Sequence, residues 1–156
     1  MNDVPEAEAR ELLKAARECQ DAPDWKPNKV LPWMYSMECG LVEADGSFGG
    51  FQVWLQVARS PKTKQRTFKF TLFQTHLGGL LRVYQLHITP TAHRPKNLHE
   101  HAHEHIGTAR EEGRADWARW DFEEALQYFC QRANITFKPP IEDPETFKLT
   151  SPKGKP

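Results

Sequence analysis

The sequence predicts an α+β fold: an antiparallel four- to five-stranded meander sheet with an N-terminal helix and a C-terminal helix packed on it. Three observations carry this prediction. Apolar residues recur at helical spacing near the N-terminus and again over 122–133. The chain between these segments alternates apolar and polar residues, as strands with one buried face do. Turn signals at Asp45-Gly46 and Gly78-Gly79 divide this alternating region into hairpins.

The N-terminal helix is predicted over 6–20. Its apolar residues share one helical face, and they are Ala9, Leu12, Leu13, Ala16 and Cys19. Three prolines within 21–32 then predict an extended connector that leads to the first strand.

Four strands are predicted from the alternation, at 33–41, 51–57, 67–72 and 80–88. Pro90 ends the fourth strand, because proline has no N–H to donate to a neighbouring strand. The connections between these strands are short, so consecutive strands are expected to pair antiparallel.

The segment His99–Ile106 is predicted to be a fifth strand or an extended rim segment. Residues 108–118 show neither the helical nor the strand periodicity clearly. Asp121 and Glu124 have the spacing of a capping box, so the C-terminal helix is expected to begin there. Its apolar stripe includes Cys130, which is therefore predicted to lie in the core.

A short strand is expected at Asn134–Phe137. The chain has 156 residues, a length that favours one domain. We expect that domain to cover 1–150 and to end in a flexible tail, 151–156, which is rich in lysine and proline.

The formal net charge is zero, with 21 basic and 21 acidic side chains, but the charges are segregated. No acidic residue occurs between Asp45 and Glu100, and this basic block carries eight basic side chains. Residues 1–45 have five basic and ten acidic groups, and residues 100–156 have eight and eleven. The chain therefore has a basic middle between two acidic ends, which favours an anionic partner for the middle.

The three cysteines, Cys19, Cys39 and Cys130, lie far apart and form no Cys-x-x-Cys pair. We therefore expect no disulfide framework and no cysteine zinc site, and the predicted location is a reducing cytoplasm. No apolar run approaches the ~20 residues of a membrane span, so no membrane partner is predicted.

The most informative motif is the run His99-Glu-His-Ala-His-Glu-His105. In an extended chain, side chains alternate between two faces, so all four histidines would share one face. They could then bind one divalent metal such as zinc, and the predicted ligands are His99, His101, His103 and His105. Alternatively, a neutral and a protonated imidazole could form an acid–base pair. A third interpretation is a solvated rim that binds metal only incidentally.

The basic block supplies the candidate nucleic-acid contacts, which are Arg59, Lys62, Lys64, Arg66, Arg82, Arg94 and Lys96. Loops at one end of a meander could bring these residues to a common edge, where Trp54 or Tyr84 could stack on a base. The alternative is that lysine-rich hairpin loops serve solubility and edge protection.

Over about 45–137 the chain resembles the TumE-type toxin-like family and related uncharacterised bacterial and prophage proteins. The matching elements are the Asp45-Gly46 turn, the Arg82-Val-Tyr84 strand, the His99–Gly107 run, and Phe122 through Cys130 to Asn134-Ile135. The family's Tyr-Asp-Asn is replaced here by His87-Ile-Thr. The resemblance implies a toxin–antitoxin or phage–host setting, a bacterial cytoplasm and RNA as a target.

Two hypotheses about function remain open. In the first, the protein is a ribonuclease-like toxin that uses His101, His103 and His105 as catalytic groups, with nearby arginines and lysines stabilising the phosphorane charge. In the second, it is a non-catalytic binding protein, such as an antitoxin, an anti-defence inhibitor or a nucleic-acid- or protein-binding module, whose segregated charges recognise the partner.

Overall fold

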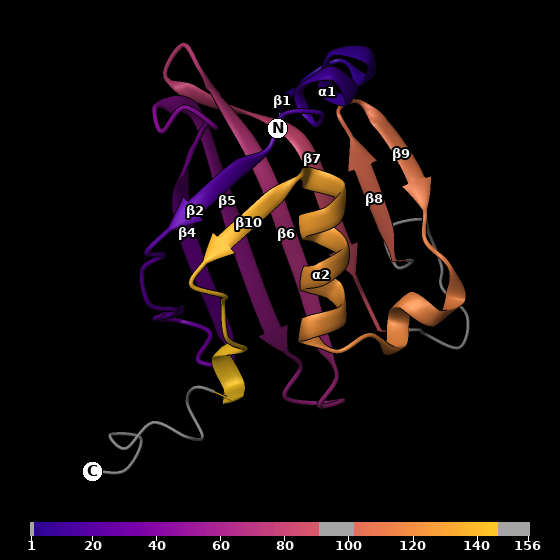
Figure 1. Ribbon diagram of the computed structural model, residues 1–156. Helices are drawn as coiled ribbons and strands as arrows, with labels where there is room; N and C mark the ends of the chain where they lie inside the picture. The colour runs from indigo at the N-terminus through magenta and orange to yellow at the C-terminus, as the bar shows by residue number, and fades with distance from the viewer. Residues whose placement is uncertain (1, 91–101, 147–156) are drawn as a thin grey trace.

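The computed structural model describes residues 2–90 and 102–146. Within these residues a single mixed sheet of ten strands is accompanied by two α-helices and a 3₁₀-helix, and residues 144–146 are also helical (Figure 1). The strands are β1 (Asn2–Asp3), β2 (Arg17–Gln20), β3 (Lys26–Pro27), β4 (Met34–Val42), β5 (Phe48–Arg59), β6 (Arg66–His76), β7 (Gly79–Ile88), β8 (His103–Ile106), β9 (Ala109–Glu112) and β10 (Ile135–Lys138). The helices are α1 (Glu6–Leu12), the 3₁₀-helix η2 (Ala115–Arg119) and α2 (Phe122–Ala133).

The main path through the sheet is β10-β2-β4-β5-β6-β7-β8-β9, while β1 pairs with β7 and β3 pairs with β4. The β1–β7 and β10–β2 pairings are parallel and the other pairings are antiparallel. The predicted combination of helices with an antiparallel meander is therefore confirmed for β4 to β7. The sheet has more strands than the four to five expected, because short segments at both ends of the chain extend it.

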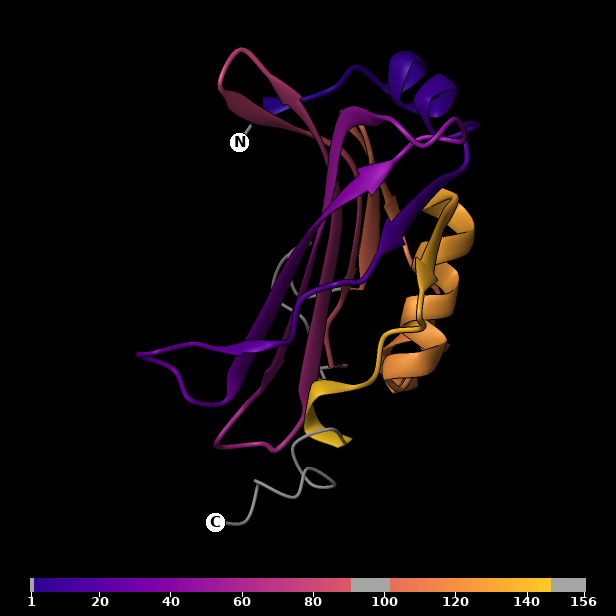
Figure 2. The same ribbon diagram turned by 60° about the vertical axis from the view of Figure 1, so that its left-hand side comes forward.

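The sheet has two chemically different faces. The apolar face is covered by α2, and Figure 2 shows α2 and β10 together on one side of the central strands. Phe70 of β6 and Leu86 of β7 are paired in register and both point to this face, where they are fully buried. The polar face is the opposite side, and it carries the residues that alternate with them, such as Lys69 and His87.

The α2 helix begins where the sequence predicts. The Asp121 side chain accepts a hydrogen bond from the Glu124 N–H, and the Glu124 side chain accepts one from the Asp121 N–H, both at 2.9 Å. Phe122 and Phe129 are fully buried, and Phe122 makes edge-to-face contacts with Phe68 and Phe70. The capping box and this aromatic contact together place the helix across β6 and β7.

The helix predicted over 6–20 is wrong in its second half. The α1 helix ends at Leu12, and Arg17–Gln20 form β2, which pairs in parallel with β10. Backbone pairing with β10 and complete burial of Cys19 outweigh the helical periodicity in this short segment.

Three further expectations need smaller corrections. The proline-rich connector contains the two-residue strand β3, and the unassigned region 108–118 contains β9 and η2. Cys130 is only partly buried, because it lies on the side of α2 next to the β10 edge rather than on the side that faces the sheet. Burial nevertheless raises the pKa of its thiol to about 12.

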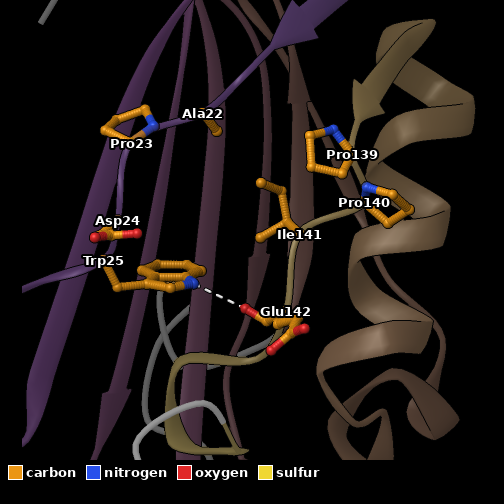
Figure 3. A pocket seen from close by; sticks show the side chains of 8 residues that line it. All are labelled: Ala22, Pro23, Asp24, Trp25, Pro139, Pro140, Ile141 and Glu142. Carbon is orange, nitrogen blue, oxygen red and sulfur yellow. Dashed lines mark hydrogen bonds between the residues drawn. The ribbon is translucent and has the colours of Figure 1, made fainter. Parts of the chain in front are cut away.

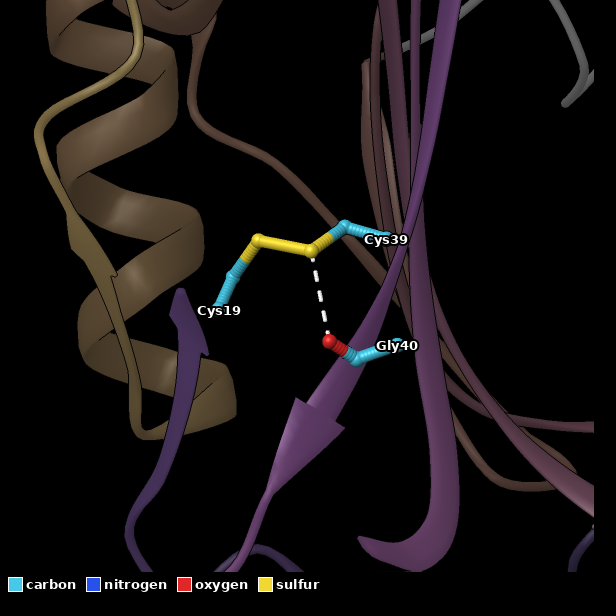
Figure 4. Close-up of a disulfide and its surroundings, with 3 residues drawn as sticks. All are labelled: Cys19, Cys39 and Gly40. Carbon is cyan, nitrogen blue, oxygen red and sulfur yellow. Dashed lines mark hydrogen bonds between the residues drawn. A yellow bond between two sulfur atoms is a disulfide. The ribbon is translucent and has the colours of Figure 1, made fainter. Parts of the chain in front are cut away.

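The expectation of no disulfide framework is wrong for one pair of cysteines. Cys19 and Cys39 form a disulfide between β2 and β4 (Figure 4), with 6.4 Å between their Cα atoms. The two residues are 20 positions apart, but the chain turns back so that β2 lies beside β4. The single registered residue pair between these strands is Glu18 with Val42, so the disulfide adds a covalent link where backbone pairing is sparse.

In the part of the chain that the structure describes, no helix combines the length and apolar character that crossing a membrane requires.

The disulfide is expected to stabilise the fold. Closing a loop of this length corresponds to about 3 kcal/mol in the chain-entropy account. We expect the Cys19→Ala/Cys39→Ala variant, and the wild type under dithiothreitol, to unfold at lower urea concentration than the oxidised wild type. Cys130→Ala is the control and should keep the full response to dithiothreitol. Equal unfolding midpoints for oxidised and reduced wild type would contradict this expectation.

Candidate functional site

Three histidines meet on the polar face, and we call them the histidine cluster: His87 of β7, with His103 and His105 of β8. His87 and His103 are paired in register on adjacent strands, and their ring centroids are 5.1 Å apart. His103 and His105 are alternate residues of one strand, with centroids 4.9 Å apart. The prediction that the run is extended with its histidines on one face is thus confirmed for the two that the structure describes.

The cluster is electrostatically unusual. The pKa of His87 is lowered to about 3, chiefly by burial and then by the neighbouring His103 and Lys69. The pKa of His105 is lowered to about 4, again first by burial and then by Arg82. Both imidazoles are therefore neutral at pH 7.

Charged side chains of both signs lie around the cluster, and Glu112 of β9 is the registered neighbour of His103. Lys69 of β6 is the registered neighbour of His87, and Arg110 of β9 is the registered neighbour of His105. Gln85 is the neighbour of His105 on β7. Its amide donates to the Thr71 hydroxyl at 2.9 Å and its carbonyl accepts from Arg82 at 3.0 Å. Arg110 is paired with Glu112 at 3.0 Å and Arg82 with Asp3 at 2.9 Å, so the polar face combines neutral imidazoles with one lysine and two ion pairs.

Glu104, which lies between His103 and His105, points the other way. Its carboxylate is buried on the apolar face and accepts from the Tyr84 hydroxyl at 2.6 Å, the Tyr128 hydroxyl at 3.2 Å and Arg132 Nε at 3.2 Å. Burial, with Glu104 beside it, raises the pKa of Tyr128 to about 12. Both phenols therefore stay protonated donors, and the carboxylate is a structural anchor rather than part of the polar face.

The predicted basic residues do not converge on the histidines. Arg66 forms a two-pronged ion pair with Asp143, at 2.6 and 2.9 Å, and Arg59 forms one with Glu145, at 2.6 and 2.7 Å. Arg59 and Arg66 are a registered pair, two residues along their strands from the apolar-face pair Val57 and Phe68. Because side chains alternate along a strand, both arginines lie on the same side of the sheet as the apolar face. We call these four residues the C-terminal ion-pair cluster.

The other predicted site residues lie in several different parts of the chain. Arg82 lies on the polar face but is bound by Asp3 through two hydrogen bonds of 2.9 and 3.0 Å. Lys62 and Lys64 lie exposed in the β5–β6 turn. Four other predicted residues, Arg94, Lys96, His99 and His101, lie outside the described residues. The structure therefore brings together only His103, His105 and Arg82 from the predicted sets.

Two members of the site, His87 and Lys69, were not among the predicted ligands or nucleic-acid contacts. The sequence places them on the two strands of one hairpin but not at paired positions. The turn residues are Leu77 and Gly78, and a register shift between Leu72 and Phe73 brings Lys69 opposite His87, whereas a two-residue turn at Gly78-Gly79 would pair Lys69 with Ile88.

Over residues 2–90 and 102–146, no group of three or more His, Cys, Asp or Glu side chains is arranged to hold a metal ion. Two of the four predicted ligands lie outside that part of the chain, so the four-histidine metal site stays a prediction.

A separate hollow lies between the connector and the segment after β10 (Figure 3). It is lined by Ala22, Pro23, Asp24, Trp25, Pro139, Pro140, Ile141 and Glu142. The Trp25 indole N–H donates to the Glu142 carbonyl at 2.8 Å, so this indole already has a hydrogen-bond partner within the protein. Its volume of ≈ 200 Å³ is below the ~300–1,000 Å³ typical of small-molecule sites, and none of the predicted site residues lines it.

Comparison with protein families, with curated proteins and with solved structures found no match to this chain. The resemblance to TumE-type toxin-like proteins therefore stays a prediction, and the polar face has to be interpreted from its own chemistry.

The lowered histidine pKa values predict a loss of stability in mild acid. In the unfolded chain these imidazoles titrate near pH 6.5, whereas in the folded protein they stay neutral until about pH 3 and pH 4. Below pH 6.5 the unfolded state binds more protons, so the free energy of unfolding should fall between pH 7 and pH 5. Urea unfolding at several pH values measures this, and His87→Asn should flatten the dependence. An NMR titration midpoint near 6.5 for either imidazole would contradict it.

The C-terminal ion-pair cluster predicts a stability effect of its own. Arg66→Gln removes both hydrogen bonds to Asp143, a side chain that is 9 % exposed, and we expect a loss of about 2 kcal/mol. Asp143→Asn in the same protein should restore part of that loss, because no buried charge remains unpaired. Lys14→Gln, which breaks the exposed pair with Glu11, is the control and should change stability by less than about 0.5 kcal/mol. Equal effects of Arg66→Gln and Lys14→Gln would show that the cluster is not structural.

Proposed function

We propose that the polar face binds RNA or another phosphate-bearing ligand, in the toxin–antitoxin or phage–host setting that the resemblance implies. The observation that carries this proposal is the position of Lys69 on β6, in register with His87 of the histidine cluster on β7 and β8. A lysine ammonium supplies charge for a phosphate, and neutral imidazole supplies an N–H donor and an acceptor nitrogen.

The protonation states of His87 and His105 favour binding without cleavage over acid–base catalysis by this pair. Cleavage of a phosphodiester by two histidines needs one neutral and one protonated imidazole. The pKa values of His87 and His105, about 3 and about 4, leave both neutral at pH 7. The ribonuclease-like hypothesis therefore needs a general acid other than these two residues, and a non-catalytic binding protein needs none.

Divalent metal binding by the histidine run remains a second proposal. It rests on neutral imidazoles being the form of histidine that binds metal. Metal analysis of tag-free protein purified without nickel, with His103→Ala as the comparison, tests it. Stoichiometric zinc that is lost in the variant would support it, and metal-free wild type would contradict it.

A cytoplasmic location also remains a proposal. It was expected from unpaired cysteines, and the Cys19–Cys39 disulfide removes that support because disulfides are rare in reducing compartments. Labelling of free thiols in freshly lysed cells distinguishes a reducing location such as the cytoplasm from an oxidising one. Three reactive thiols in denatured protein would support the cytoplasm, and one would contradict it.

Lysine substitution tests the binding proposal. We expect Lys69→Gln to weaken binding of a fluorescent single-stranded 12-mer of uridine about fivefold at 0.1 M salt, and to reduce the salt dependence by about 0.7 in log–log slope, since one phosphate contact is lost. Lys138→Gln is the matched control. It removes the same charge from β10, where Lys138 pairs with Glu18, and it should bind like the wild type. Fluorescence anisotropy measures both.

Two results would contradict the proposal: failure of the wild type to bind the oligonucleotide, or equal effects of the two lysine substitutions. Incubation of unlabelled RNA with wild type and with His87→Asn addresses catalysis separately. Cleavage by the wild type that is lost in the variant would favour the ribonuclease-like hypothesis over binding alone.

A further inference from the structure

One tryptophan, Trp54 of β5, lies on the polar face. Its cross-strand row begins at the exposed Glu38 of β4 and continues through Thr71 and Gln85, both buried, to His105. Trp54 itself is half-buried. Tyr84, the other aromatic residue considered for stacking, is fully buried and its hydroxyl is bound to Glu104. The structure therefore leaves Trp54 as the aromatic group in this row.

The indole of Trp54 is held in place by two contacts. Its N–H donates to the Gln52 side-chain oxygen at 2.7 Å, and its ring meets Phe73 edge to face with centroids 5.1 Å apart. A ring that is already ordered loses little conformational freedom when a ligand stacks on it. Trp54 thus has the properties of a rigid stacking platform.

The distance between Trp54 and the histidines limits the size of a shared ligand. Neighbouring strands are about 4.8 Å apart, so Trp54 and His105, three strands apart in one row, are separated by about 14 Å at their Cα atoms. Lys69 lies between them in the adjacent row, beside His87. A single phosphate group cannot contact both ends, whereas a short oligonucleotide can place a phosphate at Lys69 and a base at Trp54.

From this arrangement we infer that the ligand of the polar face is single-stranded nucleic acid, with Trp54 stacking on one base. Bases in a duplex are stacked on each other and do not offer a free ring face, whereas those of a single strand do. The inference rests on the proposed function, since it assigns the phosphate contact to the same face.

Affinity measurements on Trp54 variants test the inference. Stacking on one aromatic side chain contributes roughly 1–3 kcal/mol, so Trp54→Ala should weaken binding of the single-stranded uridine 12-mer about 5- to 150-fold. Trp54→Phe keeps a ring and should lose much less. Trp33→Ala is the control, because Trp33 is 37 % exposed and lies before β4, outside this row. All variants should bind inorganic pyrophosphate like the wild type.

Tryptophan fluorescence distinguishes stacking from a purely structural role of Trp54, because only stacking changes the indole emission when the ligand binds. Stacking should quench the indole emission of Trp54 when the 12-mer binds, and Trp54→Phe should remove that quenching while most of the affinity remains. A 12-base-pair RNA duplex should compete poorly with the single strand.

The outcomes separate the two proposals. Unchanged affinity for the 12-mer in Trp54→Ala, with weakened affinity in Lys69→Gln, would overturn stacking and leave the proposed function standing. Equal binding of duplex and single strand would also overturn the inference. Failure of the wild type to bind either the 12-mer or pyrophosphate would overturn both.

Discussion

The buried carboxylate of Glu104 fixes the register of β8, and the position of the histidines depends on that register. Two tyrosine hydroxyls and Arg132 bind this carboxylate beneath α2. Because side chains alternate along a strand, a shift of one residue would expose Glu104 on the polar face and bury His103 and His105 under the helix. The same contacts hold α2 against β7 and β8. The contacts of Glu104 on the apolar face thus determine where the histidine cluster lies on the polar face.

The segregated charges of the sequence have a structural explanation as well. Acidic residues from both ends of the chain fold back onto the basic middle: Asp3 binds Arg82, and Asp143 and Glu145 bind Arg66 and Arg59. Arginine suits these two-pronged pairs with carboxylates. Much of the apparent preference for an external anion is therefore satisfied within the molecule. This is why the proposed phosphate contact is a lysine on the polar face rather than the arginines of the hairpin.

The sequence predicts well the features that depend on local patterns. The meander follows from alternation and turn signals, and the start of α2 follows from the spacing of Asp121 and Glu124. What it could not predict depends on contacts between distant segments. The strand at Arg17–Gln20 exists because β10 lies beside it, and the Cys19–Cys39 disulfide exists because β2 returns to β4. His87 joined His103 for the same reason, through strand pairing that the histidine run alone does not reveal.

Neutral histidines change how the polar face would recognise an anion. Burial and nearby cations disfavour protonation of His87 and His105, so the positive charge of the face comes from Lys69 and from Arg82 and Arg110, the two arginines being paired with Asp3 and Glu112. The contribution of these two histidines to phosphate binding would then vary little between pH 7 and pH 5, unlike that of histidines that become imidazolium in this range. Recognition by such a face depends on geometry, with the cations fixed by strand register and the indole of Trp54 fixed by Gln52 and Phe73.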